Sequence, residues 1–127
     1  MPPFNILLVE DDVDVREALV EALSDRGYAV ETAGDGLVAL QVLRGGKRPG
    51  VILLDLMMPR MDGVEFRTAQ RADPKLADLP VVLLSADARI EEKARAMKVQ
   101  DAIRKPIDLE QLYRVIERIG GTSRTNA

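Results

Sequence analysis

Charged residues stand directly after three short apolar runs of this chain. Glu10 and Asp11 follow the first run, Asp55 follows the middle one, and Lys105 follows a weaker run. Carboxylate oxygens suit Mg²⁺, which proteins bind through one or two carboxylates together with water and substrate phosphate. An ammonium group beside them provides a point charge for a phosphate oxygen. These residue types indicate a site for a divalent cation and a phosphoryl group.

Each of these side chains has a predicted part in phosphoryl transfer. Asp11 and Asp55 would ligate the metal directly, and Glu10 would act through a bound water. Asp55 is also the candidate nucleophile, because a carboxylate can form an aspartyl-phosphate and a central strand would hold it rigidly. Lys105 would neutralise one phosphate oxygen, and Ser85 would donate its hydroxyl to another. Crowded carboxylates repel one another, so we expect the site to depend on a metal.

The elements that must position these residues follow from hydrophobic periodicity. Five short apolar runs alternate with five segments of helical spacing, which is typical of a parallel sheet wrapped by helices. Right-handed crossovers place the loops after strands one, three, four and five on one edge, where α/β proteins bind ligands. The chain is therefore predicted to be a doubly wound α/β domain. The predicted strands are 6–9, 28–32, 51–54, 81–84 and a short one around Ala102 and Ile103.

The helices are predicted from their caps and apolar stripes. Asp12 and Asp108 are candidate N-caps, and Asp62 with Glu65 has the spacing of a capping box. The last helix has its apolar stripe at 109, 112, 116 and 119 and ends at the glycines 120 and 121. Residues 122–127 are expected to form a disordered tail, so that the domain covers residues 1–121.

Taken singly, the candidate site residues are common in ordinary surface structure. An acidic run such as 10–12 is usually a solvated loop or a helix N-terminus, and Asp12 is assigned there. A lone Lys-Pro or Ser-Ala pair carries little information. Their joint placement at one edge of the sheet is what favours a site.

The composition argues against several function classes. The chain has 127 residues, enough for one domain with its own core. It has no cysteine, which argues against disulfides and thiolate metal sites. A net charge of −3 and 3% aromatic residues argue against direct nucleic acid binding. No apolar run approaches the roughly 20 residues that span a bilayer, and no signal peptide is recognisable, so we expect a cytoplasmic protein without membrane contact.

From Asn5 to Ile119 the motifs resemble those of the receiver domain of two-component response regulators. The matching pieces are Ile-Leu-Leu-Val-Glu-Asp-Asp at 6–12, Leu-Asp-Leu-Met-Met-Pro-Arg-Met-Asp-Gly at 54–63, Leu-Ser-Ala at 84–86 and Lys-Pro at 105–106. The resemblance implies a flavodoxin-like five-stranded sheet of order 2-1-3-4-5 with helices on both faces. It also allows a cis peptide before Pro106.

The resemblance assigns a role to each site residue. Asp55 would be the phosphoacceptor, and Glu10 and Asp11 would be the acidic pair. Met57 would offer a backbone carbonyl to Mg²⁺. The remaining two positions, Ser85 and Lys105, would bind the phosphoryl group.

By the same resemblance, the chain would receive its phosphoryl group from a histidine kinase or a phosphotransfer protein. Its binding to an unidentified downstream protein would then change. It would not be an enzyme in the turnover sense, although it would catalyse its own phosphorylation and dephosphorylation. We expect a monomer or a weak phosphorylation-dependent dimer, with the face around Arg104 and Tyr113 as the candidate contact.

One position departs from the pattern of the family. Three residues before the lysine, receivers usually carry Tyr or Phe, whose ring turns inward when a hydroxyl engages phosphate, but this chain has Ala102. Alanine has no rotamer to switch, so one alternative is a constitutive interaction module that keeps the site without the switch. A further alternative is a Mg²⁺-dependent aspartyl-phosphate phosphohydrolase. Such enzymes place a second acid two residues after the nucleophile, where this chain has Met57.

Overall fold

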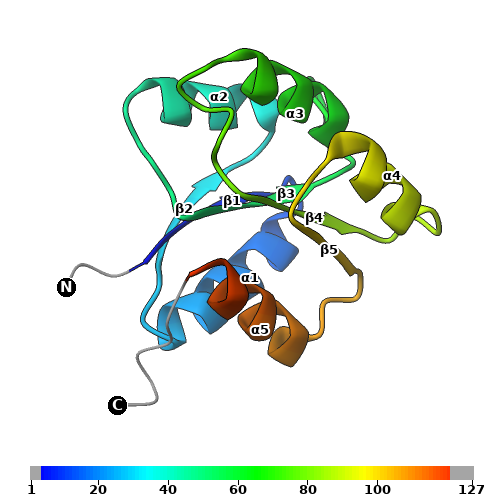
Figure 1. Cartoon of the computed structure of the whole chain (residues 1–127). Coiled ribbons are helices and arrows are strands. Elements are labelled where there is room, and N and C mark those ends of the chain that lie inside the picture. Colours follow the sequence, from blue (N-terminus) through cyan, green and yellow to red (C-terminus); the bar gives the residue numbers. More distant parts are fainter. Residues whose placement is uncertain (1–3, 121–127) are drawn as a thin grey trace.

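Five parallel strands form one sheet in the computed structural model, which describes residues 4–120. Their order is β2-β1-β3-β4-β5, as predicted (Figure 1). The strands are β1 (Asn5–Val9), β2 (Ala29–Ala33), β3 (Val51–Asp55), β4 (Val81–Ser85) and β5 (Asp101–Arg104). The helices are α1 (Val13–Asp25), α2 (Gly36–Arg44), α3 (Gly63–Ala72), α4 (Ile90–Met97) and α5 (Leu109–Ile119). The predicted tail, 122–127, lies outside the described residues.

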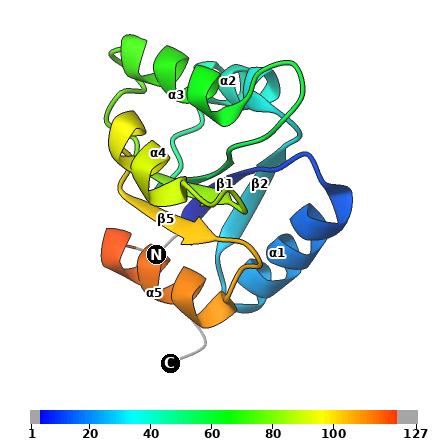
Figure 2. The same ribbon diagram turned by 90° about the vertical axis from the view of Figure 1, so that its right-hand side faces the viewer.

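Helices cover both faces of the sheet. In Figure 1, α1 and α5 lie on one face and α2, α3 and α4 on the other, and the turned view in Figure 2 agrees. Alternate strand residues serve the two sides, so that Leu7 and Leu8 belong to different core clusters. All five residues of β3 are buried, as expected of the central strand. No helix within residues 4–120 has the length and apolar character needed to cross a membrane.

The predicted caps are present at the helix starts. The carboxylates of Asp12 and Asp108 accept backbone N–H bonds, and Asp62 with Glu65 forms the reciprocal capping box. The second strand begins one residue later than predicted. Tyr28 precedes it because its N–H donates to a carbonyl of α1 at 3.2 Å, which closes the end of that helix instead.

Two side chains of the last helix lie differently from what the sequence pattern suggests. Leu109 is 40% exposed, because it opens α5 at its N-terminus and lines a surface groove beside α1. Tyr113 is buried against α1, where its hydroxyl donates to a backbone carbonyl at 3.4 Å and the Arg26 guanidinium lies 3.9 Å from its ring centroid. Arg104 pairs instead with Glu91 of α4. Arg104 and Tyr113 therefore lie on different sides of the sheet, and the dimer contact around them stays a prediction.

Candidate functional site

Three acidic side chains meet at the carboxyl edge of the sheet. Glu10 directly follows β1 and is fully buried, and Asp55 is the last residue of β3 and 4% exposed. Together with the exposed Asp11, each offers one carboxylate oxygen, and these oxygens lie within 4.8 Å of one another. The structure thus brings together the acids that the sequence analysis selected. Three hard oxygen donors at this spacing fit a divalent cation such as Mg²⁺.

Lys105 joins the cluster from the loop after β5. Its Nζ lies 2.9 Å from Glu10 Oε1 and 3.2 Å from Asp55 Oδ1. Its backbone N–H donates to the carbonyl of Ser85 at 2.9 Å, which fixes the loop to the end of β4. The peptide bond to Pro106 is cis, in agreement with the resemblance. One ammonium therefore bridges two buried carboxylates that are far apart in the sequence.

The electrostatics of the cluster favour an additional cation. Burial is the main cause that raises the pKa of Asp55 from 3.8 to about 7. Repulsion by Glu10 and a hydrogen bond with it act in the same direction, and Lys105 opposes them without cancelling them. Burial also disfavours the ammonium of Lys105, but its hydrogen bonds and its attraction to both acids outweigh this and raise the pKa of Lys105. An excess of negative charge remains that a bound cation would relieve.

The two oxygens of Glu10 are already engaged within the protein. Oε1 accepts from Lys105, and Oε2 accepts from the backbone N–H of Asp12 at 3.2 Å. This arrangement suits a water-mediated role for Glu10. It leaves Asp11 and Asp55 as the candidates for direct metal ligation.

Ser85 lies at the end of the strand that pairs with β3, and Met57 lies in the loop after β3. Ser85 ends β4 and is 2% exposed, and its Oγ accepts the backbone N–H of Asp87 at 3.0 Å. Met57 lies two residues past Asp55 in the loop before α3, and the residue is 69% exposed. The exposed thioether leaves the backbone as the part of Met57 that could serve as a ligand, as the resemblance implies.

An ion pair that no sequence pattern predicts holds the loop carrying Met57. Arg60 has a left-handed backbone with φ of 62°, and its guanidinium contacts the Asp35 carboxylate at 2.6 and 2.7 Å. Asp35 also caps α2, and Gly36 donates its N–H to a carbonyl of the same loop at 3.2 Å. Burial disfavours ionised Asp35, but the backbone bonds and Arg60 outweigh it and lower the pKa of Asp35.

Comparison with known proteins shows the family to which this chain belongs. A model of the response regulator receiver domain matches residues 6–117. The response regulator MprA of Mycobacterium sp. strain KMS is 40% identical over 112 residues, which is 87% of this chain and 47% of that protein. MprA of Mycolicibacterium vanbaalenii matches with the same identity and coverage. The chain thus spans about half the length of these curated relatives, and it belongs to the response regulator receiver family.

Solved structures show the same fold. The chemotaxis protein CheY4 of Vibrio cholerae superposes with a TM-score of 0.83 at 32% identity, covering 92% of this chain and 98% of that one. The receiver domain of the sensor histidine kinase PA1611 of Pseudomonas aeruginosa has a TM-score of 0.81 at 28% identity, covering 94% and 99%. That neighbour holds a magnesium ion coordinated in its active site cleft.

Proposed function

We propose that this chain is a phosphoacceptor module in which Asp55 receives a phosphoryl group from a histidine kinase or a phosphotransfer protein. Phosphorylation would change the binding of a downstream protein. The observation that carries the proposal is the position of Asp55, buried at the end of the central strand, 3.2 Å from the Lys105 ammonium and clustered with two further acids. Membership of the receiver family supports the same function.

The residues present fit a magnesium ion. We propose that Asp11 and Asp55 ligate Mg²⁺ directly, that Glu10 acts through a water, and that Met57 contributes its backbone carbonyl. When bound, the cation neutralises charge on the transferring phosphoryl group. The acidic cluster of this chain and the magnesium ion in the Pseudomonas neighbour support this proposal.

Each side chain of the site has its own part in the transfer of the phosphoryl group. A carboxylate oxygen of Asp55 forms the new bond to phosphorus while the bond from phosphorus to the donor breaks, and the donor leaves with that electron pair. Lys105 is placed to pair with a phosphoryl oxygen, since it already contacts the attacking carboxylate. Ser85 is placed to donate its hydroxyl proton, because its oxygen accepts from the Asp87 N–H.

The first test is labelling by acetyl phosphate followed by intact mass measurement. The parent chain should gain one phosphoryl group with Mg²⁺ and none with a chelator. Asp55→Asn keeps the size of the side chain and should gain none under either condition. Equal labelling of the parent and of Asp55→Asn would refute the assignment of the phosphoacceptor.

We further propose that the chain is not an enzyme in the turnover sense and acts only on its own Asp55. A phosphohydrolase would need a second acid two residues on, and that position is the exposed thioether of Met57. Multiple turnover of a small phosphate ester would contradict this proposal. A cytoplasmic location remains a prediction.

The phosphodonor protein has a candidate docking surface next to the site. A surface groove of about 540 Å³ includes Lys105 in its lining. A partner seated there would bring its phosphoryl group close to Asp55. The rest of the lining comes from α1, from the loops after β4 and β5 and from the first residue of α5: Val15, Ala18, Leu19, Ala86, Pro106, Ile107 and Leu109.

We predict that Ala18→Arg slows phosphoryl transfer from a phosphohistidine protein, which must dock, but not from acetyl phosphate, which need not. Ala18 is exposed on α1, so the long side chain would occupy the groove without entering the core. Transfer from a phosphohistidine protein that labels the parent should slow by about tenfold, equivalent to about 1.4 kcal/mol, while acetyl phosphate labelling is unchanged. Ser24→Arg, exposed on the same helix outside the groove, is the matched control. If Ala18→Arg accepted the phosphoryl group at the parental rate, the phosphodonor protein would dock elsewhere.

Ala102 favours a second candidate function, a constitutive interaction module. It packs against the core on the side of α4 with only a methyl group. Backbone NMR with beryllofluoride and Mg²⁺ separates the two functions. Amide shifts confined to the neighbourhood of Asp55 would favour the constitutive module, whereas shifts that reach Ala102 and Ile107 would favour a working switch.

A further inference from the structure

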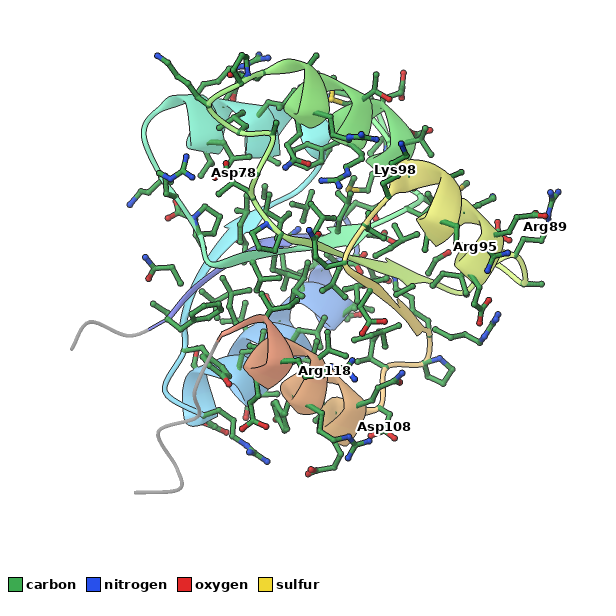
Figure 3. The ribbon with its side chains drawn as sticks, viewed as in Figure 1. Asp78, Arg89, Arg95, Lys98, Asp108 and Arg118 are labelled. Atoms are coloured by element: carbon green, nitrogen blue, oxygen red, sulfur yellow. The ribbon has the colours of Figure 1, made fainter. Side chains whose placement is uncertain are left out.

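One long side chain of β5 reaches α4. Asp101 and Ile103 face α5, where Asp101 pairs with Arg118 at 2.5 Å and Ile103 belongs to the core cluster of that side. Ala102 and Arg104 face α4. Figure 3 places Arg118 on α5, on the other side of the sheet from α4. Because Ala102 ends in a methyl group, Arg104 is the residue of this strand that contacts the polar groups of α4.

Arg104 binds both the loop between β4 and α4 and the first turn of α4. One guanidinium nitrogen donates to both carboxylate oxygens of Glu91, each at 2.8 Å, in the first turn of α4. Another donates to the backbone carbonyl of Asp87 at 3.0 Å. The guanidinium is a planar fork, so one side chain holds the loop and the helix in a fixed relative position.

Asp87 is held at each of its polar groups. Its carboxylate accepts from Lys93 Nζ at 2.6 Å and from the backbone N–H of Arg89 at 2.8 Å. Its carbonyl accepts from Arg104, and its own N–H donates to Ser85 Oγ at 3.0 Å. That last bond occupies a lone pair of the hydroxyl oxygen and leaves the hydroxyl proton to be donated. Asp87 thus links a buried side chain of the site to the surface of α4.

We propose that Arg104 is a positioning residue for Ser85 and couples it to α4. The inference rests on the proposed phosphoacceptor function of Asp55. A phosphoryl group that accepts a hydrogen bond from the Ser85 hydroxyl would draw the bonded backbone of Asp87 with it, and Arg104 would carry that movement to Glu91. The surface of α4 would then respond to phosphorylation of Asp55 although position 102 has no aromatic ring.

The test compares amide shifts on adding beryllofluoride and Mg²⁺, which stand for a phosphoryl group on Asp55. In the parent, amides near Asp55 and amides of α4 should both shift. In Arg104→Gln, the Asp55 amide should still shift, the shifts of α4 should be largely lost, and beryllofluoride should bind several-fold more weakly. Arg104→Lys keeps the charge without the fork and should not restore the shifts of α4.

A second variant keeps the test independent of how Arg104→Gln folds. Glu91→Gln weakens the ion pair between Arg104 and α4 and keeps the hydrogen bond from Arg104 to the Asp87 carbonyl. It should lose the shifts of α4 but bind beryllofluoride as the parent does. Arg118→Gln is the matched control, since it removes an ion pair of the same strand that points to α5. It should leave both readouts unchanged, and exposed pairs of this kind should each alter the Tm by less than about 5 °C.

The outcomes separate this inference from the function on which it rests. Full shifts in α4 for both Arg104→Gln and Glu91→Gln would overturn the coupling role of Arg104 and leave the phosphoacceptor function standing. Parental beryllofluoride affinity in Arg104→Gln would overturn its role in positioning Ser85. An unresponsive parent, with no shift even at Asp55, would overturn the proposed function and this inference with it.

Discussion

Asp55 combines two properties that normally exclude each other. It is nearly as buried as a core leucine, yet the proposed reaction needs its ionised form. The nearby acid Glu10 adds to the cost of ionisation, and Lys105 offsets only part of it. The raised pKa of Asp55, about 7, therefore shows that this cluster of acids favours a bound proton or cation.

At the residue scale, we predict that Asp55→Asn stabilises the metal-free chain. Between the ordinary pKa of 3.8 and the folded value of about 7, the folded chain binds more protons than the unfolded one, so the stability of the parent falls as pH rises. The gain from Asp55→Asn should grow over this range and level off above pH 7. It should reach at most about 4 kcal/mol, since the pKa of Asp55 is raised from 3.8 to about 7 and one pKa unit corresponds to about 1.4 kcal/mol.

Urea unfolding in a chelator from pH 4 to pH 8 measures this gain. Saturating Mg²⁺ should reduce it, because the cation stabilises only the parent acid cluster strongly. A variant less stable than the parent at pH 8 would mean that the ion pair with Lys105 outweighs burial and repulsion.

At the element scale, the end of β3 is held by the start of α3. Gly63 donates its N–H to the Leu56 carbonyl at 2.9 Å. A Cβ at position 63 would lie 2.8 Å from the Asp55 carbonyl oxygen and 3.0 Å from the Leu56 Cα. Both neighbours are backbone, so neither can move aside without displacing the strand end that carries the phosphoacceptor.

We predict that Gly63→Ala lowers stability by about 1–3 kcal/mol through this overpacking. It should also weaken Mg²⁺ binding, because the Asp55 backbone must shift. Urea unfolding and a Mg²⁺ titration measure the two effects. Gly34→Ala is the matched control, since its Cβ would meet only an arginine nitrogen at 3.8 Å. Parental stability of Gly63→Ala would show that the two elements separate more easily than their contacts indicate.

At the scale of the whole molecule, the metal site exists only in the folded chain. The 4.8 Å acid cluster joins the loop after β1 to the end of β3, and the Lys105 bond to Glu10 spans 95 positions of the sequence. An unfolded chain cannot hold such a site together. Binding of a cation should therefore stabilise the entire fold by mass action.

We predict that Mg²⁺ at 100 times its Kd adds about 2.7 kcal/mol to the stability of the parent. Thermal unfolding should show a higher Tm than in sodium chloride of equal ionic strength. Asp55→Asn, which lacks one of the candidate ligands, should show a much smaller rise. Equal rises for the two chains would point to a binding site elsewhere.

The sequence alone predicted the elements and the edge at which the site lies. Apolar runs, caps and the motif at 54–63 are local patterns, and each reports the periodicity of its own element. Right-handed crossovers between parallel strands then place the strand ends on one edge without any side-chain detail, whereas the strand order itself follows from the resemblance to receiver domains. These local patterns are enough to predict that Glu10, Asp11, Asp55 and Lys105 lie at one edge of the sheet.

The tertiary structure alone decided which side chains meet between elements. It turned Tyr113 toward α1 rather than beside Arg104, paired Asp35 with Arg60, and connected Ser85 through Asp87 to Arg104. Long polar side chains have several rotamers. A strand residue that can pair with any of several neighbours produces no periodic pattern in the sequence. Which partner an arginine finds depends on how neighbouring elements pack, and that is a property of the folded chain.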